Sequence, residues 1–444
     1  MRSLTFIATI ALASACGGSD STPAGPDAYT GNNPPPRIIP GGGIGDGAID
    51  GVVNLYVIDD ATRAPISGAT VRVGGMDGTT DATGLFVATD VAGPQQISVK
   101  ATGYRSEMWI GANGANCTMN LKAAVDPAVT MANITATITG FDTIPVAANH
   151  LKIGVLSYSQ DDKATDAENN IATAGNANYC AGATQTSTCT FTVTSRTGHV
   201  ALMAAIVDDD TKGTTATTDD TYTVIGWAYR TGLTVQDGVN LTGVTMTMVP
   251  ATDMVSISAS LGSPPLPTSA GLVGIELGMD GTAYLAPAFI TSTSSQIAKA
   301  PPLSAFPGAT YRLIAFANNG TTATAASSAV LLRGQSTTTL TAPAWIAPPA
   351  SPTLTLTGGT WTPASGALVQ GAEYNSATDH LLAVTMFDNS GSFTVSDVVS
   401  LPNGATGITA KATALGGTLD INNFAIDTDL AKVTAFTSQP VTIN

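Results

Sequence analysis

Charge is scarce in this chain of 444 residues. Lys and Arg number 17, Asp and Glu 32 and His 3, so charged residues make up only 11% of the sequence, against roughly 25% in an average soluble protein. The formal net charge is -15, and basic residues form no cluster. An acidic chain without a basic patch repels phosphate backbones, which argues against nucleic acid as a partner.

Helical periodicity and long apolar runs are also lacking. No segment carries a convincing helical repeat with caps over more than about ten residues, and no run approaches the ~20 apolar residues of a membrane-spanning helix. Apolar residues nevertheless make up 43% of the chain, and they alternate with polar ones at a period of two. The sequence therefore predicts an all-β protein of tandem β-sandwich modules.

Catalytic motifs are the third absence. None of the three histidines, His150, His199 and His380, starts a His-x-x-Glu or His-Glu-x-x-His motif, which argues against a catalytic zinc ion. The chain has no Gly-x-Ser-x-Gly motif and only four glutamates, so neither a serine hydrolase nor a glycosidase is indicated. We expect no enzyme activity and no cofactor, with calcium as the one exception considered below.

The N-terminus has the pattern of a secretory signal. Met1 and Arg2 precede an apolar run over 4–12. Three small residues follow at 13–15, and Cys16 comes directly after them. The segment Ala-Ser-Ala-Cys resembles the bacterial lipobox, although Ala13 stands where Leu is usual. This resemblance implies that residues 1–15 are removed and that Cys16 is lipidated. The alternative is an ordinary secretory signal followed by a chance cysteine.

The resemblance also bears on location. Gly17 follows the cysteine, whereas many such lipoproteins of Gram-negative bacteria carry Asp there when they stay in the inner membrane. This difference implies a lipid anchor in the outer membrane, on either its periplasmic or its outer face.

Three further cysteines remain. Cys180 and Cys189 flank a loop rich in Gly, Thr and Ser, and they are the predicted disulfide. Cys117 lies in a strand-like alternation, so we expect it to be a buried, inert thiol.

Composition divides the rest of the chain. Residues 16–49 carry the anchor and a Pro- and Gly-rich stretch with few apolar residues, predicted to be a disordered tether. Turn-rich joints then separate four predicted modules, at 50–125, 126–250, 251–347 and 348–444.

The first module resembles a known family. The segments 51–53, 64–73, 80–86, 92–93 and 99–104 combine alternating strands with Gly, Pro and Asp punctuation, and this pattern is similar to the carboxypeptidase regulatory-like domain. The resemblance implies a prealbumin-like (transthyretin-like) β-sandwich. Such domains are named for accompanying zinc carboxypeptidases, but the corresponding metal ligands are absent here. The three later modules share weaker features, which suggest a diverged repeat.

Acidic residues are concentrated in the second module. Asp208, Asp209 and Asp210 are separated from Asp219 and Asp220 by a Gly/Thr loop. Carboxylates at this density can hold calcium. The spacing is not that of an EF-hand, however, and the corresponding turns of the later modules carry Asn or Gly in place of carboxylates, so both facts favour solvated turns.

The four tryptophans are the remaining candidates for a binding site. Their rings could stack on sugars, but burial in cores or between modules is the usual role of such rings. They are Trp109, Trp227, Trp345 and Trp361.

These features lead to one functional hypothesis and one rival. The first is a non-catalytic, lipid-anchored protein of the cell envelope with a structural or binding role toward envelope glycan or protein. The rival is a cell-surface enzyme or enzyme-accessory subunit, related to peptidases or glycans, that has no legible motif. Converging carboxylates in a cleft would favour the rival.

Overall fold

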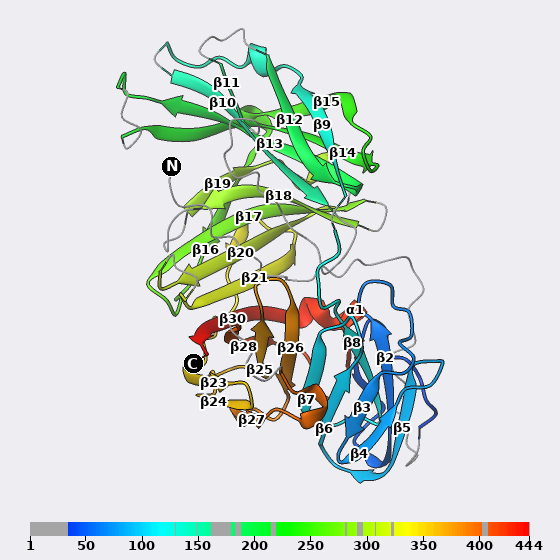
Figure 1. Ribbon diagram of the computed structural model, residues 1–444. Coiled ribbons are helices and arrows are strands. Elements are labelled where there is room, and N and C mark those ends of the chain that lie inside the picture. The colour runs from blue at the N-terminus through cyan, green and yellow to red at the C-terminus, as the bar shows by residue number, and fades with distance from the viewer. Residues whose placement is uncertain are drawn as a thin grey trace.

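The computed structural model describes residues 34–443 except 129, 149, 161–178, 183–187, 215–218, 280–281, 291–295, 307, 321–323 and 402–406. The predicted signal segment, Cys16, Gly17 and the first half of the predicted tether lie outside this part of the chain. The described residues are mostly strand and form tandem β-sandwich modules (Figure 1), which confirms the predicted fold class. None of the described helices is long and apolar enough to cross a membrane.

The first module packs two sheets around one apolar core. One sheet has the order β29-β1-β8-β2-β5, and β7-β6-β3-β4 belong to the other. Alternate residues of β2, among them Val53, Leu55 and Val57, are fully buried in this core, as period-two burial requires. The strands are β1 (Gly43–Gly45), β2 (Asp50–Asp59), β3 (Thr70–Val73), β4 (Met76–Thr79), β5 (Leu85–Ala92), β6 (Gln95–Lys100), β7 (Ser106–Ala112) and β8 (Asn116–Leu121).

Residues 34–49 correct the predicted tether. This segment lies on the first module because buried polar side chains bind its backbone. Asn54 donates to the carbonyl of Pro34 at 3.1 Å, Asn116 to that of Pro35 at 3.1 Å, and the amide of Ile39 donates to the hydroxyl of Thr118 at 2.8 Å. The segment also buries Ile44 and Ile49 in the core of the first module, and β1 pairs with β8. These isoleucines are spaced too widely among glycines to give a strand pattern in the sequence.

The second module has one seven-stranded sheet that folds over its own core, in the order β11-β10-β13-β14-β15-β9-β12. Ile134, Phe191 and Leu202 are buried in this core. The elements are β9 (Met131–Ile138), η1 (Phe141–Thr143), β10 (His150–Gln160), β11 (Tyr179–Gly182), β12 (Cys189–Arg196), β13 (Gly198–Asp210), β14 (Thr221–Val235) and β15 (Leu241–Pro250).

The third module packs the small sheet β19-β16-β22 against β18-β17-β20-β21. Its core includes Ile257, Val273 and Leu313. The elements are η2 (Ala251–Asp253), β16 (Val255–Ser260), β17 (Thr268–Met279), β18 (Thr282–Ile290), β19 (Gln296–Ala300), η3 (Leu303–Ala305), β20 (Thr310–Asn318), β21 (Ser327–Gln335) and β22 (Thr339–Thr341).

The fourth module packs the sheet β23-β24-β27 against β30-β28-β25-β26. Trp361, Tyr374 and Leu382 lie in its core. The elements are β23 (Ala350–Thr355), β24 (Gly358–Thr362), β25 (Val369–Asn375), β26 (His380–Met386), β27 (Ser392–Thr394), η4 (Asp397–Val399), β28 (Thr409–Gly417), β29 (Phe424–Ala425), α1 (Ile426–Asp429), η5 (Leu430–Lys432) and β30 (Val433–Thr442).

One strand-pairing plan recurs along the chain. In the first module β2 pairs antiparallel with β5 and parallel with β8, β3 pairs with β4 and β6, and β6 pairs with β7. The corresponding pairs are β9 with β12 and β15, β10 with β11 and β13, and β13 with β14 in the second module. They are β16 with β19 and β22, β17 with β18 and β20, and β20 with β21 in the third. The fourth repeats most of the plan, with β24–β27, β25 with β26 and β28, and β28–β30.

A 12-stranded sheet joins the third, fourth and first modules, in the order β18-β17-β20-β21-β30-β28-β25-β26-β7-β6-β3-β4. β21 pairs antiparallel with β30, and β26 pairs parallel with β7. The first and last modules therefore lie side by side, beneath the second and third in Figure 1. The two-residue strand β29 also pairs with β1, so the last module extends both sheets of the first.

Candidate functional site

The acidic residues of the second module lie at the end of the β13–β14 hairpin. Asp208, Asp209 and Asp210 are the last three residues of β13, and Asp219 and Asp220 directly precede β14. The three β13 residues pair with β10 on one side and β14 on the other. Because successive side chains of a strand point to opposite faces, Asp209 lies on the face opposite to Asp208 and Asp210. The five carboxylates therefore do not meet around one point.

The carboxylates on one face already have partners. Nδ1 of His150 lies 2.8 Å from Oδ1 of Asp208, and Nε2 of the same ring lies 3.5 Å from Oδ1 of Asp210. Asp210 also pairs with Lys212, and Asp219 accepts a hydrogen bond of 3.2 Å from the hydroxyl of Thr214. These contacts give Asp208, Asp210 and Asp219 an ordinary role in holding the hairpin.

Asp209 differs from its neighbours. Its side chain belongs to a residue that is only 5% exposed, and its Oδ1 atom has no hydrogen-bond partner; the same is true of the buried Oδ1 of Asp220. Burial raises the pKa of Asp209, and the charge of Asp220 raises it further. The hydroxyl of Tyr222 donates to Oδ2 of Asp220 at 3.3 Å, so Asp220 has a partner at one oxygen only.

A second charged group lies where the first and last modules meet, and the sequence did not point to it. Glu107 on β7 is 5% exposed and accepts hydrogen bonds from Nε and Nη2 of Arg105 at 2.8 and 2.6 Å. Two strands away, Glu373 on β25 pairs with Lys411 on β28 at 2.8 Å. Burial raises the pKa of Glu107 to about 7, against the opposing effect of Arg105. Burial also acts to raise the pKa of Glu373, but Lys411 and Arg105 outweigh it and leave the pKa lowered.

The sequence contains one weak signal for this charged group at the junction of the first and last modules. Arg105 and Glu107 are two residues apart and therefore share a face of the strand. Their neighbours across the junction come from another module, which no local pattern indicates.

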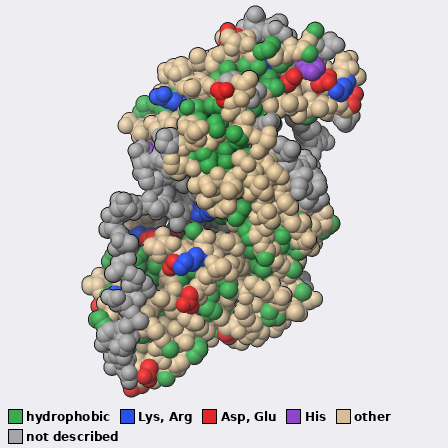
Figure 2. All heavy atoms as spheres, turned by 180° about the vertical axis from the view of Figure 1, so that it is seen from behind, with side chains coloured by type: hydrophobic (Ala, Val, Ile, Leu, Met, Phe, Trp, Pro, Cys, Tyr) green, Lys and Arg blue, Asp and Glu red, His purple; other side chains and the backbone are tan. Residues whose placement is uncertain are grey.

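A hydroxyl-rich face covers the β9–β12 pair. The hydroxyls of Thr137 and Thr190 lie 2.8 Å apart, those of Thr135 and Thr192 lie 3.2 Å apart, and Thr194 continues the series by donating to Asn133 at 2.8 Å. The alternate residues of both strands form the core of the second module. We call these six residues the threonine face. It carries no charge. Charged side chains are also sparse on the side of the molecule shown in Figure 2.

The cysteines divide as follows. Cys189 is disulfide-bonded, and Cys117 is a free, buried thiol whose pKa burial raises to about 12. That pKa suits an inert core thiol. The side chain of Cys180 lies outside the described residues, as does Cys16, so the Cys180–Cys189 pairing and the lipidation stay predictions.

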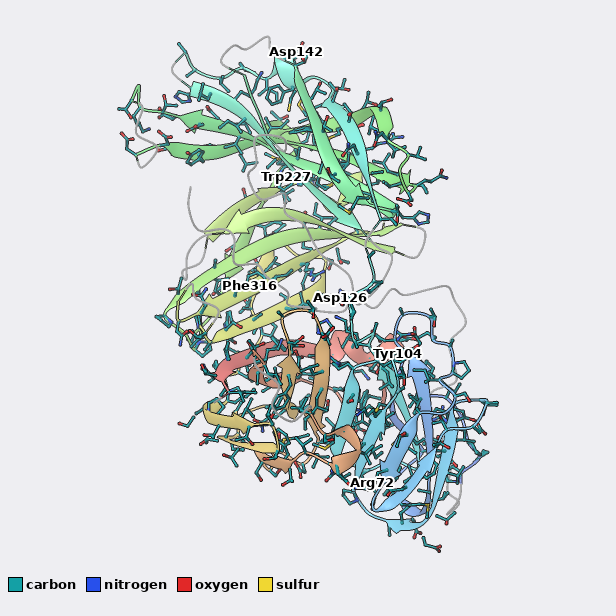
Figure 3. The ribbon with its side chains drawn as sticks, viewed as in Figure 1. Arg72, Tyr104, Asp126, Asp142, Trp227 and Phe316 are labelled. Carbon is teal, nitrogen blue, oxygen red and sulfur yellow. The ribbon has the colours of Figure 1, made fainter. Side chains whose placement is uncertain are left out.

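The tryptophans lie mostly in cores. Trp109, Trp227 and Trp361 are 6%, 1% and 6% exposed. Trp345 is half-buried and donates its indole N–H to the carbonyl of Leu261 at 2.7 Å. Trp227 lies between the second and third modules in Figure 3. Burial therefore accounts for these rings better than a row of sugar-stacking platforms.

The histidines lie apart. His150 starts β10 and His199 lies near the start of β13, which is the opposite end of that antiparallel pair. His380 is on β26, where its ring contacts Asn375 at 2.9 Å and Asp126 at 3.2 Å. Within the described part of the chain, no group of three or more His, Cys, Asp or Glu side chains is placed to hold a metal ion.

Comparison with known proteins places the chain in no family. No protein-family model matches it, and no curated protein does. The solved structures it resembles include two B repeat units of the collagen-binding protein of Staphylococcus aureus, at 13% identity over 84% of this chain and 97% of that one, with a TM-score of 0.14.

Two further structures are similarly distant. BcpA, the major pilin subunit of Bacillus cereus, is 8% identical over 66% of this chain and 97% of that one, with a TM-score of 0.14. The Bacillus anthracis TIE protein is 8% identical over 65% of this chain and 46% of that one, also with a TM-score of 0.14. At such scores the architecture described above rests on the strand pairing of this chain itself.

Proposed function

We propose that this chain is a non-catalytic, lipid-anchored protein of the bacterial cell envelope that holds a binding surface away from the membrane. The observation that carries the proposal is the 12-stranded sheet, which joins three of the four modules through backbone pairing. Continuous pairing makes a stiff body, which suits a structural or display role.

The N-terminal pattern supplies the anchor in this proposal. Residues 34–49 lie on the first module, so about half of the predicted tether is left between Cys16 and the body. The first module resembles the carboxypeptidase regulatory-like domain, and here it would act without the catalytic unit for which that family is named. Attachment to the outer membrane follows from Gly17 by resemblance alone.

The threonine face is the best candidate for the binding surface. Its hydroxyls can both donate and accept hydrogen bonds, and it has no charge to repel a neutral polymer. An envelope glycan is therefore the ligand we favour, with an envelope protein as the second candidate.

The anchor is tested by replacing Cys16. Cys16→Ser should abolish lipidation and release the protein from membranes, because acyl chains and not an apolar helix would hold it there. Two or more chains give stable attachment, whereas one gives only marginal binding. Membrane pelleting of wild type and variant measures this, and unchanged retention of the variant would show that the anchor is wrong.

The binding role needs a separate experiment. The released chain is mixed with purified envelope glycan and with detergent-extracted envelope proteins, and the bound fraction is compared for wild type and Thr192→Lys. Capture of glycan that the lysine abolishes supports the proposal. Hydrolysis of the glycan or of peptides by the purified chain would favour the rival enzymatic hypothesis.

A further inference from the structure

The pair formed by Asp209 and Asp220 is the feature of the second module that hairpin stability does not explain. Each carboxylate has one buried oxygen without a hydrogen-bond partner, and the two groups repel each other. A buried carboxylate oxygen that lacks a partner is costly, and two close together are more so. Something that is attracted to both oxygens would remove that cost.

The register of the hairpin places these two residues near each other, with Asp220 one residue before β14 begins. Asp209 pairs with Tyr222 across β13 and β14, and Asp220 lies two residues before Tyr222. Residues related in this diagonal way on an antiparallel pair have their Cβ atoms roughly 7 Å apart. Carboxylates on such positions can both reach a cation, because calcium takes oxygen ligands at about 2.3–2.6 Å.

The neighbouring charges leave the pair uncompensated. Asp208 and Asp210 add to the negative potential at Asp209, and His150 opposes it. His150 is itself placed against Asp208 and Asp210. On the other side Asp209 pairs with Leu151, an apolar residue that supplies no charge.

We infer that Asp209 and Asp220 bind a single divalent cation, calcium being the expected ion, at the end of the β13–β14 hairpin. The Tyr222 hydroxyl lies beside Asp220 and water would complete the coordination shell. Two carboxylates make a low-charge site, so we expect an affinity on the order of 10⁻⁴–10⁻³ M, as in extracellular calcium modules. This inference assigns the site to two of the five acidic residues and does not depend on the proposed anchor or ligand.

The test is a calcium titration of the purified full chain, first stripped with a chelator. Isothermal calorimetry reports affinity and stoichiometry, and the melting temperature of the second module reports linkage, since a ligand that binds only the folded state stabilises it. Wild type should bind one calcium ion, and its melting temperature should rise by a few degrees at ten millimolar calcium.

Three variants locate the site. Asp209→Asn and Asp220→Asn should each weaken calcium binding at least tenfold. Asp208→Asn is the matched control, because Asp208 adjoins Asp209 in the chain but lies on the opposite face, and it should bind within about threefold of wild type. Without calcium, Asp209→Asn should also melt at a higher temperature than wild type, since it removes the repulsion between the two carboxylates. If Asp209 only supported the fold, its replacement would lower the melting temperature.

The opposite results are equally clear. The inference is wrong if calcium neither binds nor raises the melting temperature of wild type. It is also wrong if Asp208→Asn loses as much affinity as Asp209→Asn, which would indicate diffuse attraction to acidic residues. Stabilisation of wild type by acid with no response to calcium would show that the two carboxylates share a proton.

Discussion

The junction between the first and last modules and the junction between the second and third are built in different ways. At the first, Leu382–Met386 of β26 pair in register with Ser106–Ile110 of β7, so backbone groups join the modules in addition to side chains such as Phe387, which packs in the core of the first module. At the second, side chains of β14 enter the apolar cluster of the third module: Trp227 is 1% exposed there, and the ring of Tyr229 lies 4.6 Å from that of Phe306.

This difference bears on how each junction responds to substitution. Backbone pairing makes no demand on the identity of a single side chain, whereas a packed junction loses stability with each large ring removed. The first junction also contains buried charge, at Glu107. We therefore expect the second junction to be sensitive to truncation and the first to be sensitive to pH.

Truncation of Trp227 should have the largest effect. Trp227→Ala removes a fully buried ring and leaves a cavity, which costs about 3–5 kcal/mol in the free energy of unfolding. Urea denaturation measures the loss, and hydrogen exchange shows where it falls. The second and third modules should lose protection while β7 and β26 keep theirs.

A matched control uses an exposed side chain of the same module. Val239 is 50% exposed, so Val239→Ala should change stability by less than about 0.5 kcal/mol. Equal loss of protection at β7 and β26 in Trp227→Ala would show that the two junctions unfold as one unit, and the comparison would fail.

Protonation of Glu107 should have the next largest effect. Its pKa is about 7 in the folded chain against 4.5 ordinarily, so folding favours the neutral carboxyl. The resulting stabilisation is fully present below pH 4.5 and is lost as the pH rises through 7. The shift corresponds to about 3 kcal/mol at 1.36 kcal/mol per pKa unit. Glu107→Gln, which is always neutral, should abolish this pH dependence.

Hydrogen exchange of residues 106–112, corrected for intrinsic rates, measures the effect between pH 4.5 and 8. Glu373→Gln is the control that should leave this pH dependence in place. The pKa of Glu373 is lowered from its ordinary value of 4.5, so its carboxylate stays ionised throughout this range and its contribution to stability is lost only on further acidification. A Glu107→Gln variant with the pH profile of wild type would place the sensitivity elsewhere.

The fold could be predicted from sequence where burial follows a local period. Ile134, Ala136 and Ile138 alternate with Asn and Thr residues along β9 and are buried as expected. The docking of residues 34–49 was missed, since Ile44 and Ile49 are too widely spaced among glycines to give a strand pattern and Asn54 and Asn116 bind backbone carbonyls of the segment. The junction of β7 with β26 was equally hidden, because strand pairing between distant segments leaves no periodic trace in either one.

The acidic residues show a similar limit. Adjacent aspartates suggested a single cluster because they were interpreted as turn residues. In the structure β13 continues to Asp210, so strand alternation separates Asp209 from its two neighbours. The aspartates and the Gly/Thr loop between them were sufficient to find the hairpin in the sequence. Which carboxylates can meet depends on the residue at which β13 ends, and the sequence pattern does not give that residue.

The smallest effect should come from one ring pair across the first junction. Trp109 of β7 and Phe387, which follows β26, meet edge to face with their centroids 5.6 Å apart and an interplanar angle of 79°. Such pairs contribute about 0.5–1.5 kcal/mol beyond the area they bury. A double-mutant cycle with Trp109→Leu and Phe387→Leu should return a coupling energy in that range.

Trp361 and Phe393 form the matched pair, because their centroids are 5.8 Å apart but both rings belong to the last module. Their coupling should be of similar size. The cycles measure the coupling between side chains, and hydrogen exchange of the single variants measures the backbone pairing. If pairing holds the first junction, Trp109→Leu should leave β7 and β26 protected from exchange. Loss of that protection on changing one ring would mean that side-chain packing and not backbone pairing dominates this junction, and the contrast with the Trp227 junction would disappear.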